Sequence, residues 1–433
     1  MRPIDLFPST TTAPDGVLHV GGVALDALAQ RHGTPLYVYD HATLVEGAAA
    51  YADAVRDARG GGRVHFAAKA LTAPGALRVL AETGLGIDVA SAGEIAAALR
   101  AGFTGADLVV HGNAKTTADL DAALHAGAGL IVLDSADEAA ALTARAHALG
   151  VERVDVLMRI RPDLEVSTHE KIATGHAGSK FGVSPAAAVA LIARLEAPLR
   201  FAGLHAHLGS QVSDASELHA AVGALARLAG TLNRRVEVLD LGGGLGVAYA
   251  VDDPAPDAGA YARAVVAAVD ALDDPPFLIL EPGRSVAARA GVTLYRVVAV
   301  KRDRTGPAWV CLDGGMGDNP RIALYGASYH FAIADRFGAP ADGRYHLGGH
   351  HCESGDQLGA DVPLPAPRIG DVIAVPVTGA YHQSMASTYN LFGRPAAVLV
   401  RDGDERLITR RESAEDLLAR EIVPTTATTG AVT

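Results

Sequence analysis

The sequence is poor in primary amines, and one of them stands where an enzyme could use it. Lysine supplies only five of the 37 basic residues, at positions 69, 115, 171, 180 and 301. Lys69 follows the apolar run VHFAA, so we expect it to end a strand with its side chain half-buried. Burial lowers the pKa of an amine and makes it a better nucleophile. A lysine that extends to solvent is the simpler structural alternative.

Two other segments carry groups suited to a phosphorylated cofactor. Gly242, Gly243 and Gly244 follow the run VLDL, and glycines let backbone N–H groups approach a phosphate closely. Glu281 follows the run FLIL and precedes Arg284 by three residues. A carboxylate at that place can pair with a protonated pyridine nitrogen, whereas a surface ion pair with Arg284 is the alternative.

The chain has two cysteines, Cys311 and Cys352, which makes a disulfide scaffold improbable and favours a reducing cytoplasm. Cys352 lies beside Glu353 and Asp356, a polar setting in which a thiol can act as a proton donor; an inert buried thiol is the alternative. The donor types at His346, His350, His351 and Cys352 allow a metal site to be considered. Their spacing fits no closed zinc pattern, so we expect no metal.

These residues need a scaffold, and the pattern of the chain predicts one. Between residues 60 and 285, β-rich runs alternate with Ala/Leu-rich helical stretches. Eight such units in about 225 residues is the size of a (β/α)₈ barrel; a doubly wound sheet is the competing interpretation. The expected strands are Arg63–Ala68, Gly86–Val89, Leu108–His111, Leu130–Leu133, Arg153–Ile160, Arg200–His207, Val236–Leu241 and Phe277–Leu280.

Polar residues recur at one end of these expected strands, where barrel enzymes place their catalytic groups. They include Asp88, His111, Arg159, His205 and His207, in addition to Lys69, Gly242–Gly244 and Glu281. One such residue could be a cap or a satisfied polar group. Their repetition at one rim predicts a site there.

A second, β-rich part follows Arg284. Gly/Pro-rich turns separate its expected strands, and two strand-like runs near the start of the chain can join it. We expect a barrel over residues 41–285, a β domain over 1–40 and 286–423, and a disordered tail over 424–433. The expected strands outside the barrel are Leu18–Val23, Leu36–Tyr39, Gly291–Val300, Ala308–Leu312, Asp371–Pro376 and Ala396–Arg401.

Composition excludes several classes of protein. The net charge is −12, which argues against nucleic acid or an acidic membrane as a partner. No apolar run reaches the roughly 18 residues that a membrane span needs, and the first residues lack the pattern of a signal peptide.

Eleven short motifs, in order, resemble the fold-type III pyridoxal-phosphate decarboxylases, the group that acts on ornithine, arginine and diaminopimelate. The resemblance runs from about Pro35 to Glu412. It implies an α/β barrel plus a C-terminal β domain, as in alanine racemase, and decarboxylation of meso-2,6-diaminopimelate to L-lysine and CO₂, the last step of lysine biosynthesis. The motifs are PLYVYD, FAAKA, GIDVASAGEI, HGNAKT, KFG, GLHAHLGSQ, DLGGGLG, EPGR, DGGMGDNPRIALYGA, CESGD and GAYHQSMASTYN.

The resemblance also implies roles for single residues toward pyridoxal 5′-phosphate. Lys69 would hold the cofactor as a Schiff base, His207 would stack on its ring, and Glu281 would pair with its ring nitrogen. The phosphate would be held by Ser210, Gly243, Gly244 and Arg284, with the Tyr381 hydroxyl. The implied cofactor-binding residues are Lys69, Asp88, Arg159, His207, Ser210, Gly243, Gly244, Glu281, Gly283, Arg284 and Tyr381.

For the substrate, the resemblance implies that Arg284, Arg321 and Tyr325 bind carboxylates and that Glu353 binds the distal ammonium group. Tyr381 is a further implied substrate-binding residue. Cys352 would be the proton donor. In the family the CESGD loop reaches the neighbouring subunit's site, which implies a homodimer with shared active sites.

The motifs depart from the family in FAAKA, in Ala114 of HGNAK and in Ile322 of PRIALY. The first departure keeps the lysine, the other two replace an amide and a proline without removing a group that takes part in the chemistry, and together they leave the exact substrate open. The alternatives are a decarboxylase of ornithine, lysine or a carrier-bound amino acid, a racemase on a similar barrel, and a non-catalytic binding protein. Glu281 argues against the racemase, in which arginine faces the ring nitrogen, and Arg321 favours a substrate with a second carboxylate.

Overall fold

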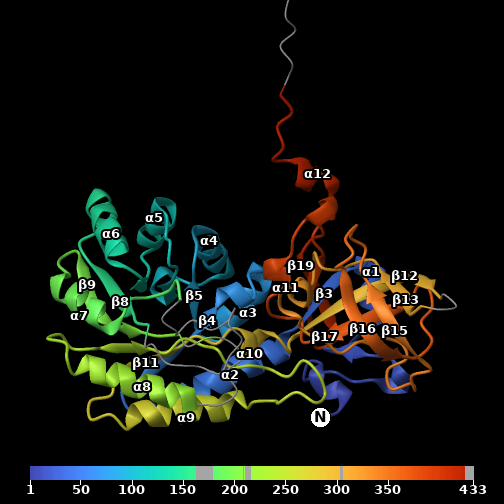
Figure 1. Ribbon diagram of the computed structural model, residues 1–433, viewed down its shortest axis with the longest axis horizontal. Coiled ribbons are helices and arrows are strands. Elements are labelled where there is room, and N and C mark those ends of the chain that lie inside the picture. The colour runs from blue at the N-terminus through green and yellow to red at the C-terminus, as the bar shows by residue number, and fades with distance from the viewer. Residues whose placement is uncertain (162–178, 208, 210–215, 303–305, 425–433) are drawn as a thin grey trace, which may run out of the picture.

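A computed structural model describes residues 1–161, 179–207, 209, 216–302 and 306–424. Figure 1 shows a barrel and a β-sheet domain side by side, with the last helix, α12 (Ala414–Leu418), projecting from the sheet domain. Ser210 and most of the expected tail, residues 425–433, lie outside the described residues. Within the described ranges, no helix is both long enough and apolar enough to cross a membrane.

The first domain is a closed barrel of eight parallel strands, in the order β10-β11-β4-β5-β6-β7-β8-β9. All eight strands expected from the sequence are present, and closure of the barrel excludes the doubly wound sheet. The strands are β4 (Gly62–Ala67), β5 (Gly86–Val89), β6 (Leu108–Val110), β7 (Leu130–Leu133), β8 (Val154–Arg159), β9 (Leu199–His205), β10 (Val238–Asp240) and β11 (Phe277–Leu280).

Helices alternate with the strands and cover the outside of the barrel (Figure 1). Short polar residues start several of them directly after a βα loop: Ser91, Thr116 and Ser135 each accept a hydrogen bond from a backbone N–H three residues on. Such caps satisfy donors that the first helical turn leaves free. The helices are α2 (His41–Arg56), α3 (Pro74–Glu82), α4 (Ala92–Ala101), α5 (Thr117–Ala126), α6 (Ala136–Ala148), α7 (Pro185–Arg194), α8 (Ser216–Ala229) and α9 (Ala258–Asp270).

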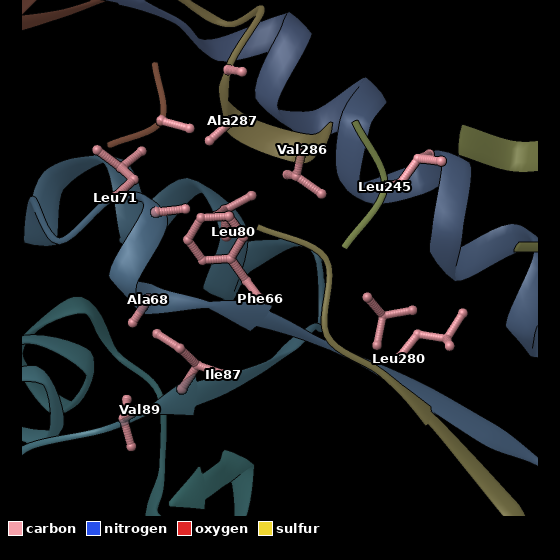
Figure 2. Close-up of a cluster of buried hydrophobic side chains, with 14 of the residues drawn as sticks. Phe66, Ala68, Leu71, Leu80, Ile87, Val89, Leu245, Leu280, Val286 and Ala287 are labelled. Atoms are coloured by element: carbon pink, nitrogen blue, oxygen red, sulfur yellow. The ribbon is translucent and has the colours of Figure 1, made fainter. Parts of the chain in front are cut away.

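Side chains alternate between two cores, because neighbouring residues of a strand point to opposite faces. Val109 lies in the barrel interior with Val132, Leu157, Ala202 and Ile279. Its neighbours Leu108 and Val110 belong to the larger core between strands and helices. Figure 2 shows part of that outer core, in which Phe66 of β4 lies among Ala68, Leu80 and Ile87.

The second domain is a mostly antiparallel sheet built around β12 (Gly291–Lys301), which pairs with β3, β13 and β17. The early strand β3 (Leu36–Asp40) is buried at every position and lies between β12 and β18, as expected for a strand that joins this sheet. The remaining strands are β13 (Ala308–Leu312), β14 (Ala332–Ile333), β15 (Gly343–Gly348), β16 (Gln357–Leu364), β17 (Val372–Pro376), β18 (Ala396–Arg401) and β19 (Asp404–Thr409).

One strand expectation is wrong. The segment Leu18–Val23 is a hairpin of two short strands, β1 (His19–Val20) and β2 (Val23–Ala24), that forms a sheet of its own. Gly21 and Gly22 both have positive φ, at 58° and 82°, which reverses the chain after two residues. The hairpin still packs on the sheet domain, because Leu18 and Val20 share a core with residues of β3, β12 and β18.

Candidate active site

A cavity of about 960 Å³ opens where the barrel strands end and the sheet domain meets them. This is the end at which barrel enzymes carry their chemistry. The structure brings most of the predicted site residues to this one cavity. Those that line it are Lys69, Asp88, Arg159, His207, Gly244, Glu281, Gly283, Arg284, Arg321, Tyr325 and Tyr381.

Lys69 follows β4 in a single 3₁₀ turn, Ala68–Ala70. The sheet domain holds this turn: Tyr381 N donates to Ala70 O (2.8 Å) and Ser384 Oγ donates to Lys69 O (2.9 Å). The expectation of a half-buried amine with a lowered pKa is wrong. The side chain is exposed to the cavity. Desolvation lowers its pKa, but the charges of Tyr381, Asp88 and Glu281 outweigh desolvation and raise the pKa above that of a free lysine.

Glu281 follows β11 and is only 4% exposed, so the alternative of a surface pair with Arg284 is wrong. Its Oε1 accepts a hydrogen bond from His111 Nε2 (2.6 Å), and its Oε2 lies 3.6 Å from His205 Nε2. Asp240, at the end of β10, is fully buried beside them. The floor of the cavity is therefore a buried cluster of carboxylates and imidazoles.

The carboxylates of this floor differ in their charge. Desolvation alone would raise the pKa of Glu281, but the charge and hydrogen bond of His111 and the nearness of His205 hold it well below the usual range. Burial raises the pKa of Asp240 well above its ordinary value, and the Glu281 charge adds to that rise. Burial raises the pKa of Asp88 to about 6. Of the three carboxylates, Glu281 is therefore the one that ionises most readily.

The glycine-rich turn after β10 lies against both His207 and Glu281. Gly243 N donates to His207 Nδ1 (3.2 Å). A Cβ added to Gly243 would lie 2.2 Å from the Glu281 carbonyl oxygen, so only glycine fits there. Burial holds the pKa of His207 well below that of a free histidine, which leaves a neutral ring at the cavity wall.

Two arginines stand at different parts of the cavity. The Arg284 guanidinium donates to Tyr249 Oη (2.5 Å) and lies over the Tyr381 ring, 4.7 Å from its centre. Arg159 is 8% exposed, lies 3.7 Å from Asp134 and stacks on Phe181. Both residues line the cavity, where a guanidinium can bind an anionic group.

Helix α11 (Arg321–Tyr325) of the sheet domain supplies the last two predicted groups of the cavity wall. Arg321 is buried, donates to Tyr329 Oη and lies over the Tyr249 ring, 4.6 Å from its centre. Tyr325 is 44% exposed. A fixed guanidinium thus comes from a different domain than Lys69.

Cys352 and Glu353 do not line this cavity; both are exposed on the loop that follows β15. Cys352 N donates to Asn390 Oδ1 (2.9 Å). Beside them stand exposed apolar side chains, Leu391 at 66% and Phe392 at 39%, and Phe392 stacks on His350. Within the part of the chain that the structure describes, Cys352 and Glu353 therefore lie outside the cavity of their own chain.

Several residues at the site had no assigned role in the sequence. Glu94, Tyr249 and Ala327 line the cavity, and Tyr329 holds Arg321. Glu94 Oε2 accepts from Ala90 N (2.7 Å), and burial raises its pKa. The signal for Glu94 was its spacing from Ser91, which is also the spacing of an ordinary helix cap.

Comparison with known proteins agrees with this arrangement. Residues 43–288 match the family described as pyridoxal-dependent decarboxylase, pyridoxal binding domain. Diaminopimelate decarboxylase of Actinosynnema pretiosum subsp. auranticum is 46% identical over 96% of this chain and 95% of its own length. The Bacillus subtilis enzyme of that name is 37% identical over 94% of this chain and 95% of its own.

Solved structures give the same result. Diaminopimelate decarboxylase from M. jannaschii, solved in complex with L-lysine, superimposes with a TM-score of 0.89 at 33% identity. The match covers 96% of this chain and 98% of that one. The chain therefore belongs to the diaminopimelate decarboxylase family of pyridoxal-dependent decarboxylases.

Proposed function

We propose that this protein removes one carboxyl group of meso-2,6-diaminopimelate as CO₂ to give L-lysine, with pyridoxal 5′-phosphate as its cofactor. The observation that carries the proposal is that Glu281, buried and hydrogen-bonded to His111, lines the same cavity as the Lys69 amine. The pKa of Glu281 is held low by His111, and a carboxylate that favours its ionised form suits a protonated pyridine nitrogen. The full-length relatives named diaminopimelate decarboxylase support the choice of substrate.

The residues of the cavity fit this cofactor. Lys69 offers a primary amine that faces open space, and Glu281 is an anion buried among imidazoles and other carboxylates with no lysine or arginine within ion-pair distance among the described residues. Arg284 and the turn around Gly243 and Gly244 offer a guanidinium and close-lying backbone to a phosphate. Amine, anion and phosphate-binding groups are the three that pyridoxal phosphate requires.

When bound, the cofactor supplies an electron sink for the substrate's α-carbon as CO₂ leaves. The chain's own residues provide position and charge. Lys69 would hold the cofactor, Glu281 would keep its ring nitrogen protonated, and the neutral ring of His207 would support its face. Arg321, fixed by Tyr329, would bind a substrate carboxylate and so favour a dicarboxylic amino acid over a simple diamine precursor.

We further propose a homodimer in which Cys352 and Glu353 of one subunit complete the cavity of the other. Both lie outside the cavity of their own chain, on an exposed loop beside Leu391 and Phe392. Cys352 would then return a proton to the α-carbon. Both cysteines are free thiols, which suits an enzyme of the reducing cytoplasm.

The substrate proposal is tested by CO₂ release from purified protein supplied with pyridoxal phosphate. We expect release from meso-diaminopimelate to exceed release from L-ornithine and L-lysine, because only the first offers Arg321 a second carboxylate. Release from ornithine or lysine alone would identify a decarboxylase of another substrate. Cofactor binding without any release would favour a binding protein.

Glu281→Gln should lower turnover by about 100-fold or more, while the affinity for pyridoxal phosphate changes little. An amide keeps the shape of the side chain but removes the charge that favours a protonated ring nitrogen. The phosphate contacts of Arg284 and the glycine turn stay intact. Steady-state rates and a cofactor titration measure the two effects, and unchanged turnover would contradict the role of Glu281.

A further inference from the structure

At the floor of the cavity are three buried carboxylates whose charges oppose one another. Glu281, Asp240 and Asp88 are each no more than 7% exposed. Like charges buried side by side oppose each other's ionisation. The proposed function requires Glu281 to be ionised. A neighbouring group must therefore favour the ionised form of Glu281 over those of Asp240 and Asp88.

His111 makes the contacts that can favour an ionised Glu281. It follows β6, where its backbone N–H donates to Val89 O (2.7 Å), which ties it to the end of β5. Its Nε2 lies 2.6 Å from Glu281 Oε1 and 3.7 Å from Asp88 Oδ1. An ionised carboxylate can only accept a hydrogen bond, so Nε2 carries the hydrogen. His111 therefore spans two of the three carboxylates and donates to one of them.

The other neighbours of Glu281 are weaker candidates. His205 Nε2 is 3.6 Å from Glu281 Oε2, beyond hydrogen-bond range. Burial lowers the pKa of His205 to about 3, so its ring is neutral. Asp240 accepts a hydrogen bond from the backbone N–H of Gly242 at 2.9 Å. Burial, the Glu281 charge and a side-chain hydrogen bond with Glu281 raise the pKa of Asp240, so Asp240 brings no positive charge to Glu281.

We infer that His111 is a positioning residue, which holds the Glu281 carboxylate in place and charged so that it can meet the cofactor's ring nitrogen. The inference rests on the proposed function. His111 need not touch the cofactor for this role. In that case, loss of His111 lowers turnover only because it disturbs Glu281.

A double-mutant cycle tests the dependence. His111→Ala should lower turnover about 10- to 100-fold, the loss typical when an orienting partner is removed. The same substitution placed in the Glu281→Gln protein should lower turnover no further. His111→Gln, whose amide keeps an N–H donor, should recover part of the loss. Equal losses from His111→Ala in both backgrounds would overturn the inference.

A second measurement needs neither cofactor nor activity. Infrared spectra of cofactor-free protein labelled with ¹³C-carboxyl glutamate separate Glu281 from the two aspartates. Wild-type protein at neutral pH should show no protonated Glu281, whereas His111→Ala should show a protonated carboxyl band that Glu281→Gln removes. Absence of that band in folded His111→Ala would overturn the inference even in a fully active enzyme.

His65→Asn is the matched control. His65 is also a buried histidine of the barrel, and it makes no ion-pair contact with a carboxylate among the described residues. It should produce no protonated glutamate band. A band as strong as that of His111→Ala would show that any loss of a buried histidine perturbs Glu281, and would contradict a specific role of His111.

If His111→Ala does not fold, His111→Gln replaces it in the double-mutant cycle and in the infrared spectra, with a smaller expected effect of the same sign.

Discussion

Lys69→Ala protein is expected to lose the covalent link to pyridoxal phosphate and to lose at least about 1,000-fold in turnover. Lys69 is the lysine that the structure exposes to the cavity, directly after β4. Lys115 also borders this cavity, but its Nζ donates to Gly112 O, Val132 O and Glu138, and its side chain is 0% exposed. Lys115 therefore serves its own loop and has no free amine to offer.

The measurement is borohydride reduction of the cofactor-loaded protein followed by peptide mapping. Label should appear on the peptide that contains Lys69 and vanish in Lys69→Ala. Lys115→Arg, which keeps a positive charge beside Glu138, is the control and should keep the label on Lys69. Label on Lys115 or Lys180 in the wild-type protein would contradict the assignment.

The sequence was sufficient for the barrel because its signals are local. Each strand is a short apolar run, and several helices begin at a capping residue such as Ser91 or Thr116. The regular alternation of these elements has few solutions. The hairpin at Gly21 and Gly22 was missed because two glycines inside an apolar run can belong to a strand or to a turn.

The site could be predicted only as far as the strand ends and the family motifs reach. Polar residues at the rim of the barrel indicated where chemistry takes place, and Lys69 and Glu281 lie there. The pKa of Lys69 could not be predicted, because it depends on Tyr381, which comes from the other domain and lies more than 300 residues away in the chain. The contact between His111 and Glu281 joins β6 to β11 and likewise exists only in three dimensions.

The position of Cys352 bears on how the complete site is assembled. The resemblance placed it in the site, whereas the structure leaves it on an exposed loop outside its own cavity. These two statements agree if the loop serves the cavity of a second subunit. A two-fold dimer would then hold two composite sites, each with the Lys69 of one subunit and the Cys352 of its partner.

Mixing two inactive variants, Lys69→Ala and Cys352→Ala, should therefore restore activity. In a mixed dimer, one site receives both defects and the other receives neither. With free exchange at equal amounts, about half of the dimers are mixed, and each has one intact site of two, so about a quarter of wild-type activity should return.

Cys311→Ala is the matched control, because Cys311 lies in β13 of the sheet domain and has no proposed role. Mixed with Lys69→Ala, it should give about half of wild-type activity. If exchange is confirmed by mass spectrometry and the first mixture stays inactive, each subunit carries its own defect, and Cys352 acts within its own chain or not at all.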